Sequence, residues 1–144
     1  MESAIFLCPG AWRPLVPPGV RLPERAGELG ERPWEVLALT PEGLSRAEAA
    51  QCRILLAPGD CGALDRIRAE RVVTYGLSHR DSLTLSSLAE PVLCVQRTLP
   101  RPDGGTLEPQ EFPLPPLPVP AAELLPLLGL RLLQMPLTGN PFSW

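Results

Sequence analysis

Three residue types that can carry out nucleophilic and acid–base catalysis occur in the middle of this chain. Cys61 follows the turn Pro58-Gly59-Asp60, and His79, the one histidine, lies shortly before Asp81. A thiol, an imidazole base and a carboxylate that orients the base form one kind of nucleophilic site. The candidate catalytic residues are therefore Cys61, His79 and Asp81. The alternative is that they are ordinary residues of a turn and a polar loop, which we favour.

A second set of polar positions suits the binding of a ligand. The run Pro58-Gly59-Asp60-Cys61-Gly62 is expected where a buried strand meets a helix, the position at which open α/β sheets bind ligands. Backbone N–H groups at a helix start can face an anion, although Asp60 can also be an ordinary helix cap. The candidate ligand-binding residues are Asp60, Gly62, Ser78 and His79.

The composition argues against several kinds of function. The chain has no lysine, so the usual phosphate-binding P-loop and Schiff-base catalysis are excluded. A net charge of -3 with scattered arginines disfavours nucleic-acid binding. The four cysteines include no CxxC pair, so we expect no zinc site, and nothing indicates a cofactor.

No segment has the length and composition of a membrane anchor or a signal peptide. The apolar run Ala4 to Cys8 is short and follows no basic segment. The most apolar stretch, Leu124 to Met135, is interrupted by Pro126, Gly129 and Arg131 and is shorter than the roughly 20 residues of a membrane span. We therefore expect a cytoplasmic protein with reduced thiols that does not bind membranes.

One α/β domain spanning residues 1–144 is expected to position the candidate residues. Thr40-Pro41 has the form of a helix start and predicts a helix to Gln51. A second helix is predicted over Cys61–Ala69, which would join two parallel strands as a βαβ unit within the central segment 53–112. Apolar runs predict strands at 3–8, 34–39, 54–57 and 72–75.

Alternating residues after Gly76 predict antiparallel strands. They cover 82–86 and 92–98, and Asp103-Gly104 predicts a hairpin turn between 92–98 and 106–112. On the wet face of these strands we expect Arg97 to pair with Glu108 or Glu111. The predicted fold class is α/β, with a small, mainly parallel sheet, flanking helices and an antiparallel β-hairpin.

Proline-rich irregular segments flank this centre, in keeping with the 20 prolines of the chain. Residues 11–33 predict a long loop, and residues 113–120 an extended polyproline segment. The latter either binds a partner or, as we prefer, forms a strap that buries apolar side chains on the domain's own surface. A short helix is expected over 120–128, a final strand or helical turn over 130–135 and a tail over 136–144.

One motif gives a family resemblance. Val73-Thr74-Tyr75-Gly76-Leu77-Ser78 and Asp81 follow a strand that ends in an acidic turn. This order resembles the later part of the ATP-binding central domain of Mur ligases, where a strand ending in TYG or TFG leads to an antiparallel layer. The resemblance covers about residues 53–130. It lacks the family's phosphate-binding loop, metal-binding acids and modified lysine, and therefore implies a related sheet without ligase activity.

Three functions follow, in order of preference. The first is a non-catalytic binding or accessory protein that resembles a degenerate Mur-ligase central domain. It would bind a protein partner through the sheet edge at Pro58–Cys61 and Gly76–Asp81 or through the proline-rich segments. The second is a small enzyme or redox protein that uses Cys61 and His79. The third is a module that binds a nucleotide or another small molecule.

Overall fold

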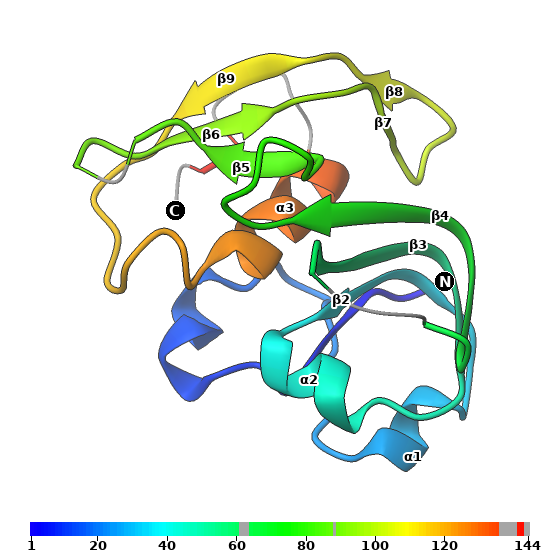
Figure 1. Cartoon of the computed structure of the whole chain (residues 1–144). Coiled ribbons are helices and arrows are strands. Elements are labelled where there is room, and N and C mark those ends of the chain that lie inside the picture. The colour runs from blue at the N-terminus through cyan, green and yellow to red at the C-terminus, as the bar shows by residue number, and fades with distance from the viewer. Residues whose placement is uncertain (61–63, 88, 136–140, 143–144) are drawn as a thin grey trace.

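The computed structural model describes residues 1–60, 64–87, 89–135 and 141–142, and within them one sheet has the order β1-β2-β3-β4-β5-β6-β9 (Figure 1). Neighbours from β1 to β5 run parallel, and β5, β6 and β9 run antiparallel. The strands of this sheet are β1 (Ala4–Phe6), β2 (Trp34–Leu39), β3 (Ala50–Pro58), β4 (Ile67–Tyr75), β5 (Leu83–Leu85), β6 (Val92–Val95) and β9 (Gln110–Pro113). The predicted α/β class with a mainly parallel sheet is confirmed.

A separate hairpin and four helical segments complete the described chain. The hairpin pairs β7 (Leu99–Pro100) with β8 (Thr106–Leu107), and the predicted turn residues Asp103-Gly104 lie between them. The helical segments are the 3-10 helix η1 (Gly10–Leu15), α1 (Ala26–Leu29), α2 (Pro41–Arg46) and α3 (Leu125–Gln134). No helix in the described part of the chain has the length and hydropathy needed to cross a membrane.

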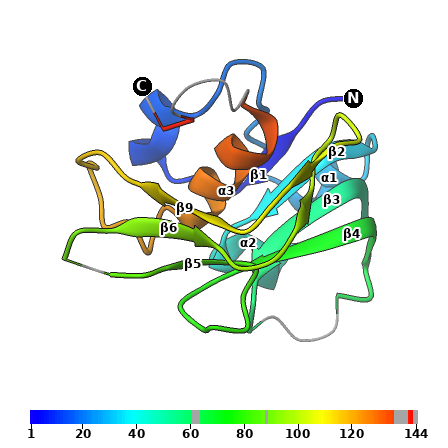
Figure 2. The same ribbon diagram turned by 90° about the horizontal axis from the view of Figure 1, so that it is seen from above.

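Helix α3 is packed against the sheet and is buried on every side. Its residues from Leu125 to Leu133 are all buried, and all of them except Arg131 are apolar or glycine. Trp12 and Leu15 of η1 belong to the same core cluster, and Figure 2 shows η1 beside α3. The opposite face of the sheet packs against α1 and α2 through a second cluster that contains Phe6, Leu39 and Leu55.

In strands β2 and β3, the alternation of side chains between the two faces of the sheet reverses partway along the strand. Trp34 and Cys52 pack in the cluster beside α1 and α2, but Val36 and Ile54 pack beside α3. Residues two apart in a regular strand share a face, so both strands are irregular in between. Arg53 lies at this point in β3, and the pairs Trp34–Cys52 and Val36–Ile54 keep one register on both sides.

The predicted helix at Cys61–Ala69 is wrong where the structure describes it. Residues Ile67–Ala69 belong to β4, residues 64–66 are not helical, and residues 61–63 lie outside the described part. β3 and β4 are nevertheless parallel neighbours, as predicted, with Ala50 opposite Ile67. The backbone pairing of β4 with β3 therefore outweighs the weak helical periodicity of apolar residues in this short segment.

Several predicted boundaries also move. α2 begins at Thr40-Pro41 as predicted, and Gly43 N–H donates to Thr40 Oγ1 at 2.9 Å. The helix ends at Arg46 rather than Gln51, because Ala50 and Gln51 already belong to β3. The predicted loop over residues 11–33 contains most of η1 and all of α1, and the two segments predicted near 120–128 and 130–135 meet in the single helix α3.

The proline-rich segment lies along the domain, where its apolar side chains reach the core. Phe112 is in β9, and Phe112, Leu114, Leu117 and Val119 are partly buried against the α3 cluster. This geometry matches the predicted strap.

Candidate functional site

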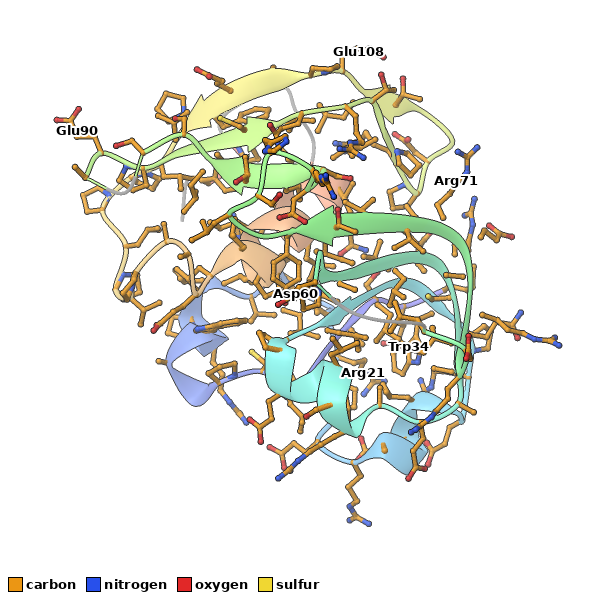
Figure 3. The ribbon with its side chains drawn as sticks, viewed as in Figure 1. Arg21, Trp34, Asp60, Arg71, Glu90 and Glu108 are labelled. Atoms are coloured by element: carbon orange, nitrogen blue, oxygen red, sulfur yellow. The ribbon has the colours of Figure 1, made fainter. Side chains whose placement is uncertain are left out.

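The candidate residues gather where β3 and β4 end, at the carboxyl edge of the parallel strands. Gly59 follows β3, and its N–H donates to Tyr75 O at 2.9 Å. Gly76 follows β4, and its N–H donates to Leu83 O at 3.1 Å. The loop from Gly76 to Asp81 connects β4 to β5 and lies beside the turn that carries Asp60 (Figure 3). We name residues 76–81 the edge loop.

Asp81 is the buried centre of the edge loop, with only 5% of its surface exposed. Its Oδ2 accepts the N–H of Ser78 at 3.1 Å, and its own N–H donates to Ser78 O at 3.0 Å. A Cβ atom on Gly59 would overlap Oδ1, and a Cβ on Gly76 would overlap Oδ2. The carboxylate therefore packs directly against two glycines and closes the loop.

Two side chains that directly follow β6, those of Gln96 and Arg97, hold the edge loop from outside. Gln96 Nε2 donates to Asp81 O at 2.7 Å and to Ser78 O at 3.4 Å. Arg97 Nη2 donates to Arg80 O at 2.6 Å. These contacts replace the predicted pairing of Arg97 with glutamates of the next strand, since Glu108 instead accepts from Thr98 at 3.0 Å. The backbone of the loop is thus tied at several points.

The outer side chains of the loop point to solvent. Leu77 is 60% exposed, and Ser78, His79 and Arg80 are exposed as well. Ser78 Oγ accepts the N–H of Arg80 at 3.1 Å, and no hydrogen bond joins His79 to Asp81 within the described residues. Asp81 therefore does not orient His79 as a catalytic carboxylate orients its base.

The predicted site residues fall into three groups. Ser78 and Asp81 are in direct contact, and Gly59, beside Asp60, packs against Asp81. His79 and Asp60 are exposed at this edge. Cys61 and Gly62 lie outside the described residues. Gln96, which holds the loop, was not predicted, because an amide at a strand end carries no sequence signal for its acceptor.

The three described thiols are poor nucleophiles. Burial raises the pKa of Cys52 to about 12 and that of Cys8 to about 11. The pKa of Cys94 is also raised, mainly by desolvation. Because only the thiolate attacks, a thiol with such a pKa is almost entirely in its unreactive form near neutral pH.

We expect iodoacetamide at pH 7.5 to alkylate Cys8 and Cys52 at least about 100-fold more slowly in the native protein than in urea. Peptide mass spectrometry of a time course measures each rate, and the urea sample is the control for intrinsic reactivity. Fast native labelling of Cys8 or Cys52 would contradict this prediction. Rapid labelling confined to Cys61 would favour the thiol-dependent enzyme.

Nothing in the described residues groups three or more His, Cys, Asp or Glu side chains in a way that could hold a metal ion. No protein-family model, curated protein or solved structure matches the chain. The resemblance to the central domain of Mur ligases therefore stays a prediction, and the function must be argued from the site.

Proposed function

We propose that the protein is a non-catalytic binding module that presents the edge loop to a protein partner. The observation that carries the proposal is the contrast within the loop. Its backbone is fixed by Asp81, Gln96 and Arg97, while Leu77 keeps 60% of its surface exposed. A loop that is already ordered loses little conformational entropy on binding, which is the main benefit of preorganisation.

The chemistry of the loop indicates the kind of surface that it fits. Leu77 offers an apolar side chain that would gain from burial, and Arg80 offers a guanidinium with no ion pair among the described residues. Interface centres combine a desolvated anchor with charged groups at the rim. The partner surface is therefore an apolar pocket with acidic residues at its edge.

A catalytic role has less support from the same geometry. The Asp81 carboxylate is turned inward against Gly59 and Gly76, and His79 has no carboxylate to orient it. The described thiols have raised pKa values. The resemblance to a Mur-ligase central domain is compatible with a domain that keeps the sheet and uses its edge for binding.

Photo-crosslinking in cells of the native host tests the proposal. Benzoylphenylalanine in place of Leu77 should give a discrete adduct with one protein, whereas benzoylphenylalanine in place of the exposed Ala11 on η1 should not. Changing Leu77→Asp should reduce recovery of that partner at least about tenfold, because a charge replaces a leucine that the complex would bury. Ala11→Asp is the matched control and should leave recovery unchanged.

Two results would contradict the proposal. One is equal crosslinking from positions 77 and 11, or none from either. The other is a rise in melting temperature with a nucleotide that is lost in Asp60→Ala or His79→Ala, because a ligand bound only by the native state stabilises it. That second result would instead support a nucleotide site at this edge.

A further inference from the structure

The sheet divides between β4 and β5. β4 pairs with β3 from Ile67 to Tyr75, but it pairs with β5 only at Tyr75, opposite Leu83. Most of the outer side of β4 therefore has no neighbouring strand among the described residues, and Figure 1 shows β4 diverging from the β7–β8 hairpin. Such a side presents unpaired N–H and C=O groups, which are a template for another strand.

Two backbone hydrogen bonds show which residues face the open side. Tyr75 O accepts from Gly59 N–H on the β3 side, at 2.9 Å, whereas Gly76 N–H donates to Leu83 O on the β5 side, at 3.1 Å. Successive residues of a strand direct their backbone groups to alternate sides. Counting back from Tyr75, Val72 directs its N–H and C=O to the open side, and its side chain is 52% exposed.

Next to this side, a groove of about 340 Å³ lies between the β7–β8 hairpin and residues 53–54 of β3 and 70–71 of β4. Buried Ile54 and Leu99 contribute apolar surface to it, and Arg71 and Thr106 contribute polar groups from opposite walls. Figure 3 shows Arg71 projecting outward from β4 near the hairpin. Side chains of a strand that paired with the open side of β4 could enter this groove beside Arg71.

The charge along β4 favours an acidic occupant. Arg68 and Arg71 are exposed and form no ion pair among the described residues. Arg53 lies 3.2 Å from Glu35 and 3.6 Å from Glu70, so this guanidinium and the two carboxylates together have a net charge of -1, and adding Arg68 and Arg71 leaves the edge with a net charge of +1. The chain as a whole carries a net charge of -3, so this positive edge is a local feature.

We propose that the open side of β4 binds an extended acidic segment of a protein partner, which adds to the sheet as a further strand. Backbone hydrogen bonds supply the affinity, and Arg68 and Arg71 select acidic side chains. The site is separate from the edge loop and goes beyond the binding function proposed for it. A second copy of this chain is a poorer occupant, because a two-fold pairing of β4 strands would bring the same arginines together.

A fluorescein-labelled octapeptide of alternating glutamate and valine tests the proposal by fluorescence anisotropy. Val72→Pro removes an N–H on the open side and leaves the bonds to β3 in place, since proline is tolerated on a free strand edge. We expect it to weaken peptide binding at least about tenfold. Arg71→Glu should weaken binding of this peptide and strengthen that of an arginine–valine octapeptide. Arg25→Glu, the same change at an exposed site beside α1, is the control and should alter neither.

The results of these measurements distinguish an acidic peptide segment from a second copy of this chain as the occupant of β4. The proposal is overturned if the acidic octapeptide does not bind, or binds Val72→Pro and the unaltered protein equally. If circular dichroism shows that Val72→Pro does not fold, two octapeptides are tested instead, one N-methylated at the odd-numbered residues and one at the even-numbered residues. If both bind as tightly as the unmethylated octapeptide, the proposal is overturned. A dimer in sedimentation equilibrium that Val72→Pro dissociates, without peptide binding, would assign the edge to a second copy instead.

Discussion

Gly59→Ala should destabilise the protein by about 3 kcal/mol, which is a large effect for the addition of one methyl group. The new Cβ would overlap Asp81 Oδ1 and lie 2.6 Å from Cγ. The carboxylate would have to leave its buried position and give up the N–H of Ser78. Urea unfolding followed by circular dichroism measures the change in the free energy of unfolding.

A double-mutant cycle tests the stated cause. Asp81→Ala removes the carboxylate and should itself cost about 1 to 2 kcal/mol, because the Ser78 N–H loses its acceptor. In that background Gly59→Ala should cost less than about 1 kcal/mol, since the methyl group has room. Gly27→Ala is the matched control, because a Cβ there has no atom within 4 Å. An equal cost of Gly59→Ala in both backgrounds would show that the carboxylate is not what requires the glycine.

The parallel half of the sheet was predictable because its strands are short continuous apolar runs. Trp34–Leu39 is buried along almost its whole length, as a strand covered on both faces should be. Thr40-Pro41 and Asp103-Gly104 mark a helix start and a hairpin turn through local chemistry alone. Where local residues determine the structure, one sequence was sufficient.

The failures arise where distant contacts decide. The segment predicted as a helix at Cys61–Ala69 contributes Ile67–Ala69 to β4, because these residues pair with Ala50–Cys52. α3 was predicted as two pieces, because a helix buried on every side shows no polar face and Gly129 lowers its helix propensity. A Cβ on Gly129 would lie 2.8 Å from Leu56 and 2.9 Å from Leu83, so this glycine allows α3 to approach the sheet closely.

The candidate site shows the same limit. The sequence placed Asp81 in a polar loop, where a catalytic carboxylate and a structural one look alike. What distinguishes them is the packing of Asp81 against Gly59 and Gly76 and its bond to Ser78. Only the last of these contacts is local, so the inward orientation of the carboxylate could not be read from the sequence.

Arg131→Met should destabilise the protein by about 2 to 4 kcal/mol, although the side chain that it removes is a buried cation. Arg131 lies in α3 with 5% of its surface exposed, and burial lowers its pKa. Its Nε donates to Pro141 O at 3.0 Å, and its Nη1 donates to Leu15 O at 2.9 Å. Methionine fills similar volume but leaves both carbonyl oxygens without this donor, and so loosens η1 and the C-terminal segment from α3.

Arg101→Met is the matched control for this prediction. Arg101 also donates to two carbonyl oxygens, Leu132 O and Met135 O, both at 2.8 Å, but it is only partly buried. Water can take its place, so the cost should be about 1 kcal/mol. Urea unfolding of both variants separates the two sites. If Arg131→Met is as stable as the unaltered protein, the desolvation of the guanidinium offsets its hydrogen bonds to Pro141 O and Leu15 O.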